Sequence, residues 1–286
     1  MRRLAIVLSG GAVGGGEARL LIGKARDAKP RCGAMVLIVL LAWLGPVRGA
    51  PASETRCWID KGALVAPAAF GDVAGDFLID LSAPVSVLHV TRAQEDGLEG
   101  IAATRDLSIA GRRLAGVTLA IVDLDARTAK FDTTINGVIG ADLLRRFVVE
   151  IDPSPCRLRL LRRRSGAWPG SVRLAIREIG GRPLTLARVT DGLKVRSGLF
   201  AIDTADWATI VAGARLSRPQ PADPPAPVRL RGVEVAGRLF EQVPAALRPP
   251  AGDETPDAIG MAIWSRWRLR LDLRHGWLEL APAEEK

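Results

Sequence analysis

The sequence downstream of residue 60 consists of two related halves, and this internal repeat restricts the fold more than any other feature. Residues 135–147 read INGVIGADLLRRF, and residues 257–267 read DAIGMAIWSRW. The glycines of these two segments, Gly140 and Gly260, are 120 residues apart. Each glycine ends an apolar run and precedes a short helix-like run, so the two segments agree in pattern as well as in spacing.

Two further landmarks occur once in each half and in the same order. Asp80 and Asp203 each follow a short apolar run and are 123 residues apart. Gly111 and Gly237 each lie in an Ala-Gly-Arg triplet and are 126 residues apart. A nearly constant offset between ordered landmarks indicates a tandem duplication. We therefore expect two lobes with the same architecture.

The pattern along both halves is typical of short strands. Apolar runs alternate with Gly, Pro, Asp and Asn, and long amphipathic helices are scarce. The two Ala-Gly-Arg triplets predict β-hairpins. The candidate strands are residues 77–79, 107–109, 119–122, 147–151 and 158–161 in the first half, and 199–202, 228–235 and 269–280 in the second. The sequence therefore predicts an all-β, two-lobed fold with a few short helices.

Residues 1–52 have the character of a leader. Residues 36–47 form an apolar run that is too short for a comfortable membrane span, and Lys29 and Arg31 precede it. Small residues follow at 49–52, which suits signal-peptidase cleavage before Ser53. The leader predicts export to the periplasm or the exterior. The alternative is an uncleaved leader that anchors the chain in a membrane.

The two lobes are expected at residues 53–165 and 166–286. The boundary falls in a connector that contains Gly and Pro, and the basic run 157–164 before it is expected to be solvated. Residues 219–227, which are rich in proline, predict a surface loop inside the second lobe.

The charge distribution argues against a nucleic-acid partner. The chain of 286 residues carries a net charge of +9, but the leader alone holds eight Lys and Arg against two acidic residues. The rest of the chain therefore holds 32 basic and 29 acidic residues. Because this balance leaves little excess positive charge to contact phosphates, we expect no nucleic-acid partner. We also expect a monomer.

Cysteine usage agrees with export. Cys32 lies in the leader, which leaves Cys57 and Cys156 in the mature chain. An even pair in an oxidising compartment predicts one disulfide, which would tie the start of the mature chain to the end of the first half. The alternative is two unpaired thiols.

The paired aspartates are the best candidates for catalysis. Asp80 in FLIDLSA and Asp203 in LFAIDTA each stand where an apolar strand ends and the chain turns. A carboxylate at the edge of an apolar core is costly unless it is paired or hydrogen-bonded. Two carboxylates brought together by an internal two-fold would share a proton. One would then activate water while the other protonates a substrate carbonyl oxygen.

These segments resemble the retropepsin-like and pepsin-like aspartic proteases. In that family each lobe has an apolar strand, Asp-Thr/Ser-Gly, a flap hairpin, and an apolar-apolar-Gly segment that leads into a short helix. The matching segments here are residues 79–82 and 202–205 for the aspartate element, and 138–144 and 258–264 for the glycine element. The resemblance implies that Asp80 and Asp203 are catalytic, that Ser82 and Thr204 support their loops, and that Gly140 and Gly260 are structural.

The sequence also departs from this family. Ser82 and Ala205 stand where the family has the glycine of its aspartate motif, which allows a tight turn toward the carboxylate. The hydroxyl residue that holds the two loops together is Thr204 in one half but Leu81 in the other. The chain contains no Tyr, so the flap tyrosine of pepsin-like enzymes is absent. Asp206 adds a third acid near the second site.

The function predicted from the sequence is that of an aspartic-type endopeptidase, with activity weakened by these departures. It would act on a peptide or protein without metal or cofactor. The alternative is a catalytically inactive binding or scaffolding protein on the same fold. His89 and His275 occupy unrelated places in the repeat, so a Ser-His-Asp triad or a zinc site is not expected.

Overall fold

The computed structural model describes residues 53–212, 228–248 and 256–283, which belong to one compact unit, Gly49–Lys286. The expected leader, its cleavage site and the proline-rich stretch 219–227 lie outside the described residues. Among the residues described, no helix has both the length and the apolar character needed to cross a bilayer.

The first lobe is built on a seven-stranded sheet with the order β2-β3-β4-β8-β5-β7-β6. Its strands are β2 (Trp58–Asp60), β3 (Ala63–Phe70), β4 (Val73–Ile79), β5 (Val87–His89), β6 (Ala102–Ile109), β7 (Arg112–Val122) and β8 (Ile135–Ile139). Strands β4 and β8 pair in parallel, as do β5 and β7, whereas β5 and β8 are antiparallel.

The second lobe repeats this sheet strand for strand, in the order β12-β13-β14-β18-β15-β17-β16. Its strands are β12 (Arg177–Ile179), β13 (Arg182–Thr190), β14 (Val195–Ile202), β15 (Thr209–Ala212), β16 (Val228–Val235), β17 (Arg238–Arg248) and β18 (Ala258–Ile259). The parallel and antiparallel pairings also match those of the first lobe. The two lobes therefore share one architecture, as the duplication in the sequence predicted.

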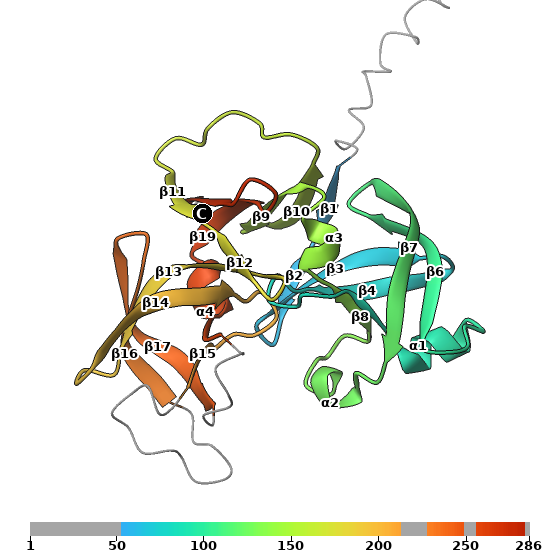
Figure 1. Ribbon diagram of the computed structural model, residues 1–286, viewed down its shortest axis with the longest axis horizontal. Helices are drawn as coiled ribbons and strands as arrows, with labels where there is room; N and C mark the ends of the chain where they lie inside the picture. Colours follow the sequence, from blue (N-terminus) through green and yellow to red (C-terminus); the bar gives the residue numbers. More distant parts are fainter. Residues whose placement is uncertain (1–52, 213–227, 249–255, 284–286) are drawn as a thin grey trace, which may run out of the picture. The chain divides into compact units, whose positions relative to one another are not determined.

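A third, six-stranded sheet joins the two halves, in the order β1-β10-β9-β19-β20-β11. Its strands are β1 (Glu54–Arg56), β9 (Val148–Pro153), β10 (Cys156–Leu161), β11 (Val172–Ala175), β19 (Trp267–Asp272) and β20 (Trp277–Pro282). Strands β9 and β19 meet at its centre (Figure 1). Ile151 of β9 pairs there with Leu269 of β19. The apolar run 269–280 is thus two strands separated by a turn rather than one.

Four short helices lie between these strands in the described segments: α1 (Val90–Glu95), α2 (Asp125–Thr128), α3 (Ala141–Leu144) and α4 (Met261–Trp264). Helices α3 and α4 each follow a repeat glycine and pack their apolar residues into the core. Trp264 is fully buried and Trp267 is nearly so, which places both in the core.

The two Ala-Gly-Arg triplets form the tight hairpins that the sequence predicted. Ala110 and Gly111 connect β6 to β7 with positive φ angles of 46° and 68°. Ala236 and Gly237 connect β16 to β17 with φ angles of 56° and 75°. Two successive residues with positive φ match the right-handed twist of the strands that they join, and glycine adopts such angles without strain.

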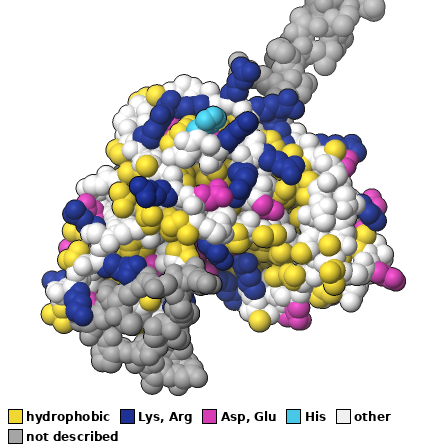
Figure 2. All heavy atoms as spheres, in the orientation of Figure 1, with side chains coloured by type: hydrophobic (Ala, Val, Ile, Leu, Met, Phe, Trp, Pro, Cys, Tyr) yellow, Lys and Arg dark blue, Asp and Glu magenta, His cyan; other side chains and the backbone are white. Residues whose placement is uncertain are grey.

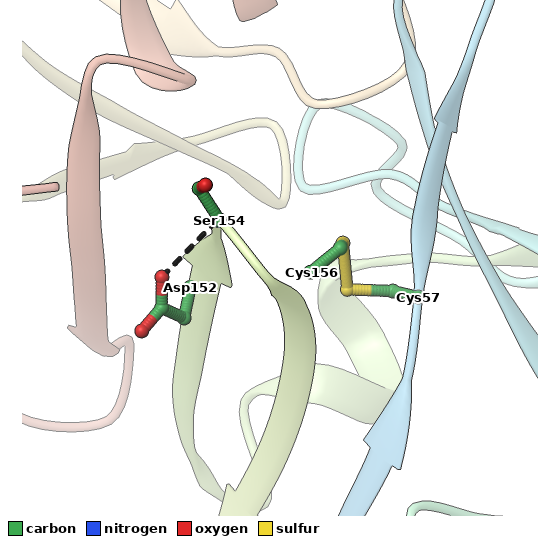
Figure 3. The surroundings of a disulfide bond; sticks show 4 residues. All are labelled: Cys57, Asp152, Ser154 and Cys156. Carbon is green, nitrogen blue, oxygen red and sulfur yellow. Dashed lines mark hydrogen bonds between the residues drawn. A yellow bond between two sulfur atoms is a disulfide. The ribbon is translucent and has the colours of Figure 1, made fainter. Parts of the chain in front are cut away.

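The end of the first half is held by covalent and ionic contacts. Cys57 and Cys156 are joined by a disulfide, with their Cα atoms 5.0 Å apart (Figure 3). Arg157 and Arg159 belong to strand β10, and both pair with Glu54 of strand β1. This part of the basic run is therefore a paired strand rather than the connector that the sequence indicated, and its arginines stay partly exposed while they pair with an acidic neighbour.

The surface charges of the described part are mixed rather than segregated. Figure 2 shows Lys and Arg side chains scattered over the visible face among acidic and hydrophobic ones.

Several arginines form ion pairs, and one of these pairs lies in the interior. Arg270 is buried between Glu150 and Glu279 of the joining sheet. Burial alone would raise the pKa of Glu279, but hydrogen bonds from Ser171, Trp168, Arg164 and Arg270 lower it to about 2.

Candidate active site

Each candidate aspartate stands at the end of the third strand of its lobe. Asp80 follows β4, and its N–H donates to the carbonyl oxygen of Ile139 at 3.0 Å. Asp203 follows β14, and its N–H donates to the carbonyl oxygen of Ile259 at 3.0 Å. Only 1% of Asp80 and 3% of Asp203 is exposed. The parallel pairing with β8 or β18 therefore ends at a buried carboxyl group in both lobes.

The turn around each carboxylate has the same hydrogen bonds. Asp80 Oδ1 accepts from the N–H groups of Ser82 at 2.7 Å and Ala83 at 3.1 Å. Asp203 Oδ1 accepts from the N–H groups of Ala205 at 2.8 Å and Asp206 at 3.1 Å. A carboxylate that accepts from the residues two and three positions onward fixes the direction of the turn by itself.

Glycine is not required at the third position of these turns. The non-glycine residues with positive φ in the described segments are Lys61, Ala110, Ala236 and Gln242. Ser82 and Ala205 are not among them, so their side chains do not strain the backbone. The loss of glycine therefore leaves both turns closed, contrary to the impression given by the sequence.

Thr204 connects the two aspartate loops. Its hydroxyl donates to the carbonyl oxygen of Ile79 at 2.6 Å and accepts from the N–H of Leu81 at 3.0 Å. The carbonyl oxygen of Thr204 also accepts from the N–H of Leu64 at 2.7 Å. Leu81 offers only its backbone to this bridge, because its side chain is fully buried in the apolar core. Only the Asp203 loop therefore contributes a side chain to the link, and the Asp80 loop contributes backbone groups.

The repeat glycines make room for the aspartate loops. A Cβ atom on Gly140 would lie 2.6 Å from the carbonyl oxygen of Ala83, and one on Gly260 would lie 2.4 Å from that of Ala208. Such distances are well below van der Waals contact between carbon and oxygen. We assign Gly140 and Gly260 the role of allowing this close approach, which agrees with their expected structural role.

Both carboxyl groups line one cleft with a volume of about 480 Å³. The first half contributes Asp80, Ser82, Ala83, Pro84, Val85, Val87, Val122, Leu124 and Arg127, and the second contributes Arg182, Ala201, Asp203, Asp206, Ile210, Arg248, Pro256 and Ala258. The side chain of Leu81 is not part of this lining. The cleft therefore remains open at the aspartates, and its walls combine apolar residues with charged ones.

An arginine that sequence reasoning missed pairs with one of the two aspartates. Arg127 of α2 forms an ion pair and hydrogen bond through Nη2 with Asp80 Oδ2. The first residue of the same helix, Asp125, is held by His89 Nε2 at 3.1 Å. The hydroxyl of Ser82 donates to Asp80 Oδ1 at 2.7 Å. Asp80 is thus surrounded by donors on both oxygens.

Asp203 has a different electrostatic environment. Burial, and then the negative charges of Asp80 and Asp206, raise the pKa of Asp203 to about 7, against a smaller opposing effect of the Ala205 and Asp206 N–H groups. Asp206 itself pairs with Lys130 Nζ at 2.6 Å. Within the described segments no hydrogen bond reaches Asp203 Oδ2. Because its pKa lies near 7, Asp203 is partly protonated at neutral pH and can donate a proton into the cleft.

One group of side chains outside the cleft has the donor set of a metal site. Ligand atoms of His89, Asp123 and Asp125 lie within 4.8 Å of one another. The two carboxylates are exposed, and contacts within the group already engage these residues, since Asp123 Oδ1 accepts from the N–H of Asp125 at 2.8 Å. These contacts account for the group as a support of α2, and we assign no metal to it.

The sequence offered no signal for Arg127 or Lys130. Both follow strand β7, and each reaches an acidic residue far away in the sequence, at Asp80 and Asp206. Charge alone does not single them out among the 40 Lys and Arg residues of the chain. Only the placement of α2 beside the cleft identifies them.

Comparison with known proteins bears on the fold. No family model matches the sequence, and no curated protein matches it. The protein is similar to the solved structure of the aspartic proteinase from Irpex lacteus, with a TM-score of 0.50 and 11% sequence identity. The match covers 81% of this chain and 97% of that chain. The protein thus has a two-lobed all-β fold similar to that of a pepsin-like aspartic proteinase.

Proposed function

We propose that this protein is an aspartic-type peptidase in which Asp80 is the general base and Asp203 is the general acid. The observation that carries the proposal is the pair of matching turns, which present two buried carboxyl groups to one cleft. Thr204 bridges these turns, so the two groups are held in a fixed relation. A likeness in fold to an aspartic proteinase is consistent with this chemistry, but the proposal rests on the site.

The roles follow from the two environments. Asp80 has the cationic partner Arg127, whereas burial and the charges of Asp80 and Asp206 raise the pKa of Asp203 to about 7, so that Asp203 is partly protonated near neutral pH. Pairs of titratable groups with divergent environments indicate which is the acid and which is the base. Asp80 would take a proton from water as the water oxygen bonds to the peptide carbonyl carbon. Asp203 would give its proton to the carbonyl oxygen.

The resulting gem-diol would then collapse. Asp80, now protonated, returns its proton to the leaving amine nitrogen as the C–N bond breaks, and Asp203 takes back a proton from the diol. A carboxylic acid and an amine leave, and both aspartates regain their initial states. The net reaction consumes one water molecule and one peptide bond, and no other reactant is needed.

The test is cleavage of a peptide library by the purified mature chain and by Asp80→Asn and Asp203→Asn. General acid–base groups contribute about 10²- to 10⁴-fold each, so both substitutions should abolish detectable turnover. Asp76→Asn provides a matched control, because Asp76 lies on β4, the strand that ends just before Asp80, but does not line the cleft. Cleavage that persists in both active-site variants would contradict the proposal.

A second candidate function is peptide binding without hydrolysis on the same fold. Asp80 accepts from Ser82 twice, from Ala83 and from Arg127, so a water molecule must compete for its oxygens. Under this alternative, peptides would bind the wild-type cleft and leave it uncleaved. Intact recovery of bound peptides over a range of pH, measured by mass spectrometry, would favour it.

We also propose that the protein acts outside the cytoplasm as a monomer. The leader-like residues 1–52 and the Cys57–Cys156 disulfide support this location. N-terminal sequencing of the exported protein and light scattering of the purified chain test both points.

A further inference from the structure

One charged side chain of the cleft stands apart because the described residues offer it no hydrogen-bond or ion-pair partner. Asp80 pairs with Arg127, Asp206 pairs with Lys130, and Arg248 lies 3.5 Å from Asp257. Arg182 also lines the cleft, yet within the described part of the chain its side chain forms no hydrogen bond or ion pair. Its guanidinium is therefore available to a ligand.

The backbone of Arg182 is fixed in place. Arg182 begins β13 directly after the turn of the β12–β13 hairpin, where Gly180 and Gly181 have φ angles of 57° and 76°. Arg145, in the other half, reaches this hairpin twice, since it pairs with Glu178 at 3.1 Å and donates to the carbonyl oxygen of Gly181 at 3.3 Å. The hairpin tip is thus tied across the two halves.

These contacts set Arg182 beside the loop of Asp80. A Cβ atom on Gly181 would lie 3.0 Å from the Cβ of Pro84, which follows Asp80 by four positions and also lines the cleft. The start of β13 therefore packs against the loop that follows Asp80, and Arg182 and Pro84 line the same cleft. A chain bound in this cleft would share it with Arg182, Asp80 and Asp203.

The chemistry of the remaining lining indicates what such a chain carries. Val85, Val122, Leu124 and Ile210 give the cleft apolar walls. A half-buried guanidinium between such walls loses hydration that a carboxylate restores through two parallel hydrogen bonds. Arginine is suited to this bidentate contact by its planar fork of donors.

We propose that Arg182 binds a carboxylate of the peptide substrate and so directs the enzyme to peptides with apolar residues and an acidic group. The proposal rests on the proposed peptidase function and adds its substrate class. The carboxylate belongs either to a Glu or Asp side chain or to the C-terminus of the peptide. Arg182 contacts substrate for specificity and takes no part in proton transfer.

The test compares three peptides of otherwise identical apolar sequence. The first has an internal Glu and an amidated C-terminus, the second has Gln and an amidated C-terminus, and the third has Gln and a free C-terminus. We expect Arg182→Ala to raise KM about tenfold or more for one carboxylate-bearing peptide with little change in kcat, because the lost contact binds ground state and transition state alike. The amidated Gln peptide should be unaffected.

Arg177→Ala is the matched control, because Arg177 is exposed on the same hairpin and does not line the cleft. Arg182→Glu should invert the preference toward a Lys-containing peptide. Whichever of the first and third peptides responds identifies the source of the carboxylate. An equal loss for all three peptides, or no loss for any, overturns the proposal.

A binding measurement separates this proposal from the peptidase function. Fluorescence anisotropy with the same labelled peptides and the Asp203→Asn chain reports recognition without hydrolysis. Arg182-dependent binding by a protein that never cleaves would support carboxylate recognition and reject the peptidase. Cleavage that depends on both aspartates but ignores peptide charge would do the reverse.

Discussion

The turns of Asp80 and Asp203 have nearly the same backbone and opposite electrostatic surroundings. In both, Oδ1 accepts from the N–H groups two and three positions onward, and the aspartate N–H donates to the strand that ends at the repeat glycine. Yet Asp80 has a cationic partner in Arg127, whereas Asp203 has acidic neighbours and a pKa raised to about 7.

This contrast shows where a duplicated site becomes asymmetric. The loops themselves preserve the direction of each carboxyl group, because backbone hydrogen bonds determine it. The difference in charge comes from Arg127 of α2, which pairs with Asp80, and from Asp206, which lies near Asp203; neither residue belongs to the repeat landmarks. An internal two-fold in the backbone is thus compatible with two different chemical roles.

The largest expected effect is on the free energy of unfolding, which the burial of an ionised aspartate lowers. The folded-state pKa of Asp203 is raised from 3.8 to about 7, so the folded state binds more protons than the unfolded state between these values. Stability therefore falls as pH rises through this window, by up to about 4 kcal/mol above pH 7. Asp203→Asn removes this cost, and urea unfolding should show the variant to be more stable at pH 8 but not at pH 4.

Asp80→Asn serves as the comparison. It relieves part of the repulsion on Asp203 but leaves Arg127 without its ion pair, so the two effects oppose each other. We expect a gain at pH 8 well below that of Asp203→Asn. Equal gains in the two variants would mean that the turns do not differ as described.

A somewhat smaller effect is expected from the bridge between the loops. Thr204→Val preserves shape but leaves the N–H of Leu81 and the carbonyl oxygen of Ile79 without the hydroxyl, at a cost of about 2–4 kcal/mol. Ser82→Ala removes one partly buried hydrogen bond from the other loop and should cost about 1 kcal/mol or less. Thermal unfolding of the two variants at one pH measures the contrast, and a larger loss for Ser82→Ala would refute it.

The features that the sequence predicted depend on local backbone geometry. Gly140 and Gly260 allow close approaches of the backbone, and Gly111 and Gly237 allow tight hairpins. At each of these positions the geometry favours glycine, so the residue type itself indicates the local structure. Because each of these glycine signals occurs once in each half, the two-lobed architecture could be predicted from the sequence.

The features that the sequence did not reveal depend on side chains that meet from distant segments. Arg127 reaches Asp80 and Arg182 reaches the cleft only through the packing of α2 and of the β12–β13 hairpin. The sequence also overstated the need for glycine at Ser82 and Ala205, since the φ angle at those positions could not be known. Long-range placement and local φ are not encoded in residue type alone.

The smallest expected effect concerns Arg127, and it tests the contrast most directly. Arg127→Ala leaves the charge of Asp80 without its cationic partner, which strengthens the repulsion that raises the pKa of Asp203. Asp203 then keeps its proton to higher pH, and the basic limb of the kcat/KM profile should move upward by about one unit. Arg92→Ala, on α1 and outside the cleft, should leave this limb in place. An unchanged profile in Arg127→Ala would mean that the ion pair does not distinguish the two aspartates, and the assignment of acid and base would lose its physical basis.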